Sequence, residues 1–329
     1  MVLPGLLELE AAAELVHRII PPTPQIRWPL LCARTGAEVF VKHENHSPVG
    51  AFKIRGGIVY MDALRRREPG LRGVIAATRG NHGQSIACAA GGAGLRAVIV
   101  VPRGNSREKN AAMRALGAEL IEHGSDFQEA YEYSARLAES LRLHFVRSFE
   151  PALVAGVAGY ALELFRGVPD LHSVYVPIGM GSGICGTIAA RDALGLKTEV
   201  VGVVAAGAPA YARSFAAGRP VSTATADTLA DGIACRVPDP EALEIILRGA
   251  ARIVTVTDEE ISAAICHLFT DTHNLAEGAG AAALAALLQE RSAMHGRRVA
   301  VILTGGNIDR DVFARVLLHG PVREMERGA

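Results

Sequence analysis

Short apolar runs alternate with helical patterns along almost the whole of this 329-residue chain. Most of the runs are continuously apolar, as expected for strands that are buried on both faces. The strand candidates are Val39–Glu44, Val74–Ala77, Ala97–Val101, Glu119–Glu122, Phe145–Arg147, Ser173–Ile178, Glu199–Val204, Arg252–Val256 and Arg298–Leu303. The helix candidates include Phe52–Arg67, Gly83–Ala93, Arg107–Leu116, Phe127–Leu141, Ala152–Phe165, Glu259–Asp271 and Gly278–Gln289. This alternation predicts an α/β fold with doubly wound, mostly parallel sheets, and the number of strands favours two sheets.

Composition and charge exclude several classes of protein. Half of the residues are hydrophobic and 21% are charged, which allows a large core and argues against disorder. The 34 basic and 34 acidic residues balance, so neither nucleic acid nor a membrane surface is expected as a partner. The longest uncharged apolar stretch, Gly278–Leu288, is too short to span a bilayer. Five scattered cysteines without a C-x-x-C motif predict reduced thiols, a cytoplasmic location and no metal site.

One lysine has an unusual position. The segment Gly50-Ala51-Phe52-Lys53-Ile54-Arg55-Gly56-Gly57 follows the first strand candidate, and Lys53 falls in the first turn of the next helix. The helix dipole disfavours a cation there, so this amine should lose its proton more readily than most. The neutral amine is the form that reacts with an aldehyde. The alternative is an ordinary solvated lysine, and the rest of the chain has to decide between the two.

The loop Thr78-Arg79-Gly80-Asn81-His82-Gly83 follows a strand candidate and precedes a helix. Ligands bind beyond the carboxyl ends of strands in open α/β sheets. A hydroxyl, an amide and free backbone N–H groups at a helix N-terminus suit a carboxylate. The alternative is an N-cap turn made of common capping residues.

A second loop, Gly179-Met180-Gly181-Ser182-Gly183, also joins a strand to a helix. Alternate glycines allow several N–H groups to point at one phosphate. The spacing fits neither a dinucleotide fingerprint, because Ile184 interrupts it, nor a Walker loop. A tight turn between strand and helix is the alternative interpretation.

A third loop, Thr304-Gly305-Gly306-Asn307, follows the last strand candidate. Two glycines after a hydroxyl permit the close approach of a flat ligand, although such a sequence alone is more often a plain turn. An amine, a carboxylate site, a single-phosphate loop and this hydroxyl together match the needs of pyridoxal 5′-phosphate (PLP).

With these residues considered together, the chain resembles the fold-type II PLP enzymes, specifically the serine/threonine dehydratase family, which includes threonine ammonia-lyases and serine racemases. The matching segments are Lys42–Asn45, Gly50–Gly57, Arg79–Gln84, Pro177–Gly186, Ala230–Gly232, Glu277–Gly280 and Leu303–Asp309. The resemblance implies a tryptophan synthase β-like fold. Residues 51–150 would form a small domain, and residues 1–50 and 151–329 a large PLP-binding domain. A homodimer is also implied.

The same resemblance implies roles for individual residues. Lys53 would bind the cofactor covalently, and Phe52 would pack beside its ring. Asn81 would meet the ring 3′-oxygen, and Thr304 would face the pyridine nitrogen. The phosphate would be held by Gly179, Met180, Gly181, Ser182 and Gly183. The substrate would be bound by Thr78, Arg79, Gly80, Asn81 and His82.

The implied activity is the elimination of water from a β-hydroxy amino acid, L-threonine or L-serine, to give a 2-oxo acid and ammonia. Lys53 would take the α-proton. The Thr304 hydroxyl is too weak an acid to keep the ring nitrogen protonated, which favours elimination over a long-lived carbanion. Racemases of this group use a serine as second base where this chain has Arg79. A guanidinium does not deprotonate at neutral pH, so racemisation is disfavoured.

Arg79 leaves the substrate open. It either turns outward or reaches the substrate and selects an acidic or hydrogen-bonding side chain. In the second case the substrate would be another 3-hydroxy amino acid, such as hydroxyaspartate or phenylserine. The segment Val203–Ala210 lacks the carboxylates of cation-activated members, so no divalent cation is expected there. The chain also ends soon after its last expected helix, which favours a catabolic enzyme without a regulatory domain.

Overall fold

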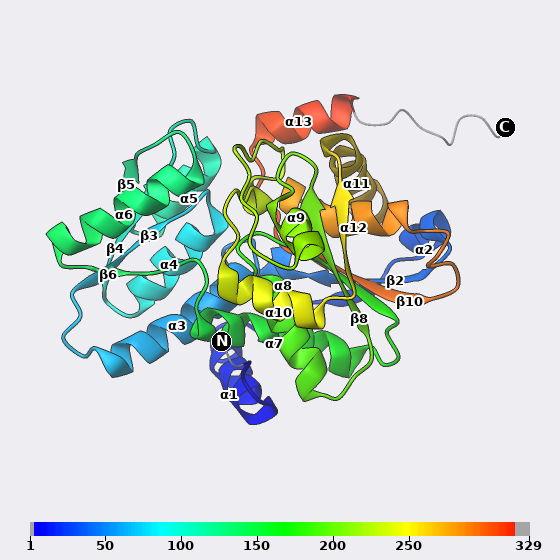
Figure 1. The fold of residues 1–329 in the computed structure, drawn as a ribbon, viewed down its shortest axis with the longest axis horizontal. Coiled ribbons are helices and arrows are strands. Elements are labelled where there is room, and N and C mark those ends of the chain that lie inside the picture. The colour runs from blue at the N-terminus through cyan, green and yellow to red at the C-terminus, as the bar shows by residue number, and fades with distance from the viewer. Residues whose placement is uncertain (1–2, 320–329) are drawn as a thin grey trace.

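The computed structural model describes residues 3–319. Helices pack on the faces of two β-sheets (Figure 1). The larger sheet has the strand order β1-β2-β10-β7-β8-β9, with bounds Gln25–Arg27, Glu38–His43, Arg298–Leu303, Ser173–Pro177, Glu199–Ala205 and Arg252–Val256. The smaller sheet has the order β5-β4-β3-β6, with bounds Glu119–Glu122, Arg96–Val101, Gly73–Ala77 and His144–Phe145. Neighbouring strands are parallel except for the pair β1 and β2.

The helices cover both faces of each sheet. Helices α1 to α7 span Leu6–His17, Pro29–Thr35, Lys53–Arg67, Asn81–Gly92, Arg107–Ala115, Phe127–Leu141 and Pro151–Gly167. Helices α8 to α13 span Ser182–Ala193, Ala210–Ala217, Pro240–Gly249, Asp258–Thr272, Gly278–Gln289 and Arg310–His319. Two short 3₁₀ helices, η1 and η2, span Glu44–His46 and Asp231–Ile233. No helix between residues 3 and 319 is long and apolar enough to cross a membrane.

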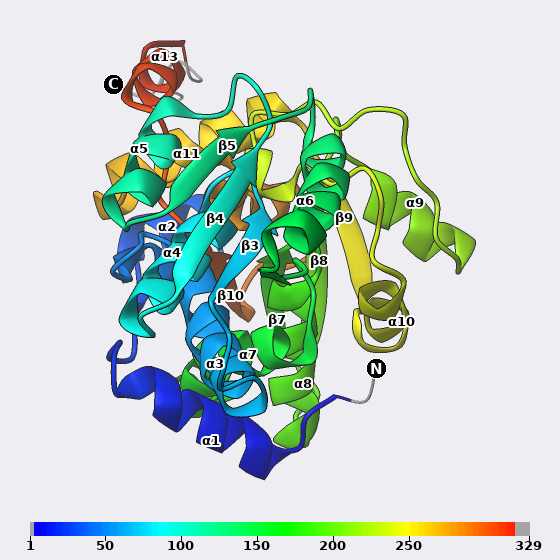
Figure 2. The same cartoon turned by 90° about the vertical axis from the view of Figure 1, so that its left-hand side faces the viewer.

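The core follows from the apolar strands of the sequence. Side chains along a strand point alternately to opposite faces. In β8, Val200 and Val204 pack with α7, α8 and α10, whereas Val201 and Val203 pack with α11 and α12 on the other face. The smaller sheet is built in the same way, with α4 and α5 on one side and α6 on the other (Figure 2). Burial on both faces explains why these strands are continuously apolar.

Helix α3 lies between the two sheets and packs on both α4 and α7. The first turn of α3 is held by a buried network of ion pairs. Arg55 donates to Glu44 over 2.7 Å and to Glu163 over 2.6 Å. Lys42 on β2 also contacts Glu163, at 2.5 Å. Two cations and two carboxylates thus balance inside the molecule and fix the start of α3 against β2 and α7.

The α/β fold and the two mostly parallel sheets confirm the sequence prediction. Every strand candidate overlaps a strand of the structure. The prediction placed the start of α4 two residues late, at Gly83 instead of Asn81. The residue directly before the helix is Gly80, which has no side chain to mark the start, and the hydroxyl that accepts from the Gly83 N–H belongs to Thr78. Helix α8 likewise begins at Ser182, within the segment Gly179–Gly183 that the sequence predicted as a loop.

Candidate active site

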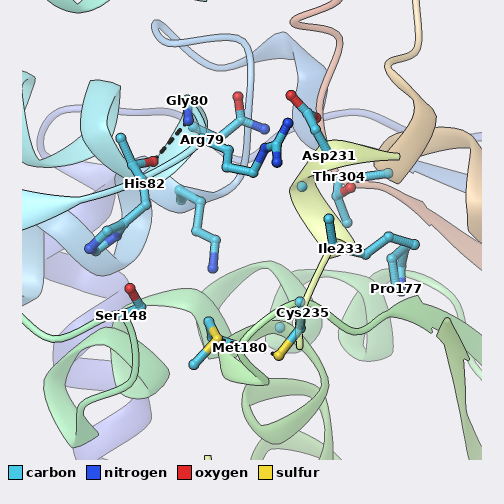
Figure 3. Close-up of a pocket in the computed structure, with 18 of the residues that line it drawn as sticks. Arg79, Gly80, His82, Ser148, Pro177, Met180, Asp231, Ile233, Cys235 and Thr304 are labelled. Carbon is cyan, nitrogen blue, oxygen red and sulfur yellow. Dashed lines mark hydrogen bonds between the residues drawn. The ribbon is translucent and has the colours of Figure 1, made fainter. Parts of the chain in front are cut away.

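One cavity lies where β3, β7 and β10 end at their carboxyl sides (Figure 3). Every residue that the sequence assigned to the cofactor or the substrate lines this cavity. These residues are Phe52, Lys53, Thr78, Arg79, Gly80, Asn81, His82, Gly179, Met180, Gly181, Ser182, Gly183 and Thr304. The three loops and the lysine therefore form a single site, although Lys53 and Thr304 lie 251 residues apart in sequence (304 − 53).

Lys53 is the first residue of α3, as predicted. The chain before it runs along the end of β10, because the Phe52 N–H donates to the Thr304 carbonyl over 3.0 Å. This contact brings the start of α3 to the cavity. The Lys53 Nζ atom donates to the Ser182 hydroxyl over 2.9 Å. Burial lowers the pKa of Lys53 from 10.5 to about 8, so neutral amine is present near neutral pH.

The loop from Gly179 to Gly183 curls into the first turn of α8. Gly181 has a φ of +103°, a conformation that residues with a side chain rarely adopt. Two tyrosines hold the loop from outside, since Tyr211 donates to the Met180 carbonyl over 3.1 Å and Tyr160 to the Gly183 carbonyl over 2.9 Å. The N–H groups of the first helical turn have no partner within the helix, which leaves them available for an anion.

The loop after β3 is shaped by Thr78. Its hydroxyl accepts hydrogen bonds from Gly80 N–H over 2.8 Å and from Gly83 N–H over 3.1 Å. The N–H groups of Asn81 and His82 open helix α4 and cannot bond within it. The start of α4 is thus a second place in the cavity where an anion can bind, and it suits a carboxylate.

A group of charged residues missed by the sequence analysis fixes the amide of Asn81. Its Nδ2 donates to Glu277, and its Oδ1 accepts from Asn307 over 2.8 Å. Lys109 on α5 lies 2.9 Å from Glu277 and 2.7 Å from Asp231. Burial alone would lower the pKa of Lys109, but the two carboxylates raise it above its usual value. With both ends of the amide bonded, Asn81 keeps one N–H for a ligand.

These missed residues carried little signal in the sequence. Asp231 and Glu277 lie in segments that supported the family resemblance, where no role was assigned to either. Lys109 lies on a helix of mostly polar composition, which gave no reason to single it out. Ser148, which also lines the cavity, has no motif around it.

Within residues 3–319, four residues that line the cavity have a buried polar atom without a hydrogen-bond partner, namely Arg79 Nε, His82 Nε2, Ser148 Oγ and Glu277 Oε2. Of these, Glu277 Oε2 is ion-paired with Lys109. Burial and the nearby Lys53 charge lower the pKa of His82 to about 3, so its ring is neutral. Unpaired polar groups cost about 1–3 kcal/mol each when buried, and a ligand with polar groups would offset that cost.

The cavity fits PLP. Lys53 offers an amine for the aldehyde, and the loop before α8 offers N–H donors for one phosphate. Asn81 offers a free N–H for the ring oxygen, and Thr304, which is 4% exposed, offers a hydroxyl for the ring nitrogen. Among the described residues, no group of three or more His, Cys, Asp or Glu side chains is placed to hold a metal ion.

Comparison with known proteins agrees with this fit. Residues 16–305 match the family described as pyridoxal-phosphate dependent enzyme. The L-threonine ammonia-lyase of Thermotoga maritima is 35% identical over 317 residues, which cover 96% of this chain and 79% of that relative. The catabolic L-threonine dehydratase of Escherichia coli is 32% identical over 304 residues, 92% of each chain. Maize serine racemase superposes with a TM-score of 0.89 at 25% identity, covering 96% of this chain and 98% of that structure.

Proposed function

Because the chain belongs to the family of pyridoxal-phosphate-dependent enzymes, we propose that it is a dehydratase that converts a β-hydroxy amino acid, L-threonine or L-serine, to a 2-oxo acid and ammonia. The observation that carries this proposal is the meeting of Lys53, the start of α4 and the start of α8 in one cavity. These three features provide an amine, a carboxylate site and a phosphate site.

When bound, PLP supplies an aldehyde that an amine can capture and a ring that withdraws electrons from the carbon bearing the amino group. The protein supplies the proton transfers and the positioning. Lys53 Nζ takes the proton from the α-carbon of the substrate, for which its lowered pKa of about 8 is suited. The Ser182 hydroxyl, 2.9 Å away, holds this nitrogen in place.

The start of α4 orients the substrate by binding its α-carboxylate, and Asn81 orients the cofactor ring. Loss of the α-proton and of the β-hydroxyl removes one water, and hydrolysis returns one water. L-threonine therefore gives 2-oxobutanoate and one ammonium ion, with no other reactant. Thr304 is a neutral partner for the ring, which suits a reaction in which the leaving group departs as the proton is removed.

Elimination is favoured over racemisation by the residue at the position of the racemase base. Arg79 lines the cavity there, and a guanidinium cannot remove a proton at neutral pH. The protein loaded with PLP should release 2-oxobutanoate and ammonia in equal amounts from L-threonine, and pyruvate and ammonia from L-serine. Formation of the D-amino acid without ammonia would instead identify a racemase.

The proposal extends to the setting of the enzyme. Similarity over 92% of both chains to a catabolic dehydratase supports a role in amino-acid breakdown. All five cysteines are free thiols, which supports a reducing compartment such as the cytoplasm. We further propose the domain division at residues 51–150, with each sheet as the core of one domain, and a homodimer. Light scattering of the purified protein tests the dimer.

A further inference from the structure

The cavity has three separate groups suited to a carboxylate or a phosphate, whereas L-threonine and PLP together bring only one of each. The start of α8 suits the cofactor phosphate, and the start of α4 suits the α-carboxylate. Both of these sites are made of backbone N–H groups. The third group is the guanidinium of Arg79, which also lines the cavity. The cofactor phosphate and the substrate α-carboxylate already have sites at the two helix starts, so neither needs this guanidinium.

The guanidinium of Arg79 faces the cavity without a carboxylate partner among the described residues. The acids that line the space around it are paired with other cations. Asp231 lies 2.7 Å from Lys109, and Asp126 lies 2.9 Å from Arg236. Figure 3 shows Arg79 on the side of the cavity where Asp231 lies, away from Met180 at the phosphate loop. The Nε of this guanidinium is buried and has no hydrogen-bond partner, so a ligand that offers a hydrogen-bond acceptor would offset the cost of burying it.

A second, smaller hollow lies beside Arg79. It adjoins the main cavity, and both are lined by Arg79, Phe127, Met180, Ala234 and Cys235. Because Arg79 lines both spaces, the geometry favours the inward orientation over the outward one that the sequence left open. The side chain stands between the place for the substrate and additional space.

We propose that Arg79 binds a second acidic group of the substrate, so that the enzyme also dehydrates 3-hydroxy amino acids that carry a carboxylate on the β-carbon. This proposal rests on the proposed dehydratase function and extends its substrate class. The reaction breaks the same Cα–H and Cβ–O bonds as with L-threonine. 3-Hydroxyaspartate gives a 2-oxo dicarboxylic acid and ammonia, and one water is lost and one regained. A planar guanidinium can hold such a carboxylate by two parallel hydrogen bonds.

Binding of unreactive amino acids tests Arg79 separately from turnover. L-aspartate and L-alanine both lack the β-hydroxyl, so neither can lose water, and the change in the visible spectrum of the PLP-loaded enzyme reports their binding. The wild type should bind L-aspartate at least ~10-fold more tightly than L-alanine, since a charge-assisted pair contributes roughly 1.5–3 kcal/mol. In Arg79→Gln this ratio should fall to ~1. Arg79→Lys should retain part of it, and the exposed control Arg72→Gln all of it.

Kinetics complete the test. The kcat/KM for 3-hydroxy-L-aspartate should fall at least ~10-fold more than that for L-threonine in Arg79→Gln. An unchanged aspartate-to-alanine ratio in this variant would overturn the proposal. Equal weakening of both amino acids would overturn it too, because Arg79 would then hold the α-carboxylate that they share. If no hydroxy amino acid releases ammonia, the dehydratase function fails, and the binding ratio still decides the role of Arg79.

Discussion

The Lys53 Nζ atom donates a hydrogen bond to the Ser182 hydroxyl over 2.9 Å, and each of these residues is the first of a helix. Two helix N-termini thus point at one amine. Burial lowers the pKa of Lys53 to about 8, and the positive ends of two helix dipoles favour the neutral amine further. The same helix end that suits the cofactor phosphate therefore prepares the lysine that would hold the aldehyde.

The pH dependence of cofactor binding tests this pairing. The apoenzyme should bind PLP covalently at a rate that rises with pH, with a midpoint at about pH 8, and that levels off about one pH unit higher, where the neutral fraction of Lys53 is nearly complete. An ordinary lysine would give a midpoint at about pH 10.5. Stopped-flow absorbance at a series of pH values measures the rate. A midpoint near pH 10 would show that the pKa of the Lys53 amine is not lowered.

Substitution of Gly181 in the phosphate loop should weaken the binding of PLP. An alanine at Gly181 would need an unfavourable φ of +103°, and its Cβ would lie 2.6 Å from the Cβ of Ala242. Such strain costs roughly 1–2 kcal/mol, so the affinity for PLP should fall about tenfold. Absorbance titration of the apoenzyme measures it. The matched control is Gly70→Ala, since no atom lies within 4 Å of a Cβ added there. Equal affinities of the two variants would argue against this loop as the phosphate site.

The strands could be predicted from sequence because parallel strands buried on both faces are continuously apolar. Strand β1 has only three residues, two of them exposed, and so gives no such pattern. Helix α1 was overlooked although its signal exists. Its buried residues Leu9, Ala12, Ala13 and Val16 have the spacing of one helix face.

Much of the site could also be predicted, because glycine-rich loops after strands mark where ligands approach the backbone. The group of Lys109, Asp231 and Glu277 could not, since charges far apart in sequence become neighbours only in the folded chain. Arg79 was ambiguous for a similar reason. Whether a loop side chain points inward depends on what surrounds it.

The buried ion pairs under α3 predict a large loss of stability. Arg55→Met removes the guanidinium that bonds both carboxylate oxygens of Glu44, at a position that is 0% exposed. The free energy of unfolding should fall by about 3–5 kcal/mol, as for other buried pairs that lose one partner. Urea denaturation of the holoenzyme measures the change. Arg96→Met removes an exposed pair with Glu119 and should leave stability essentially unchanged. Similar losses in both variants would contradict this account.

The buried carboxylate of Glu163 should make the stability of the fold depend on pH in the acidic range. Burial alone would raise the pKa of its carboxyl, but Arg55 and Lys42 lower it from 4.5 to about 2. The stability that ionised Glu163 contributes is present above pH 4.5 and is lost as the pH falls towards 2. Glu163→Gln should be less stable at neutral pH and lose less stability between these two pH values. Parallel stability curves for variant and wild type would exclude this role.

Replacement of the amine itself predicts loss of function without loss of fold. Lys53→Ala removes the group that would bind PLP covalently and take the α-proton. Turnover of L-threonine should fall by ~10³-fold or more, and the visible absorbance of the bound cofactor should disappear. The control is Lys197→Ala, which changes an exposed lysine. Circular dichroism should show the same fold in both variants.

The most direct measurement is to reduce the PLP-loaded protein with borohydride and to map the modified peptide by mass spectrometry. One added reduced cofactor is expected on the peptide that contains Lys53, together with the loss of ammonia release from L-threonine. Modification of a different lysine, or an unmodified Lys53 in protein that is still active, would contradict the account.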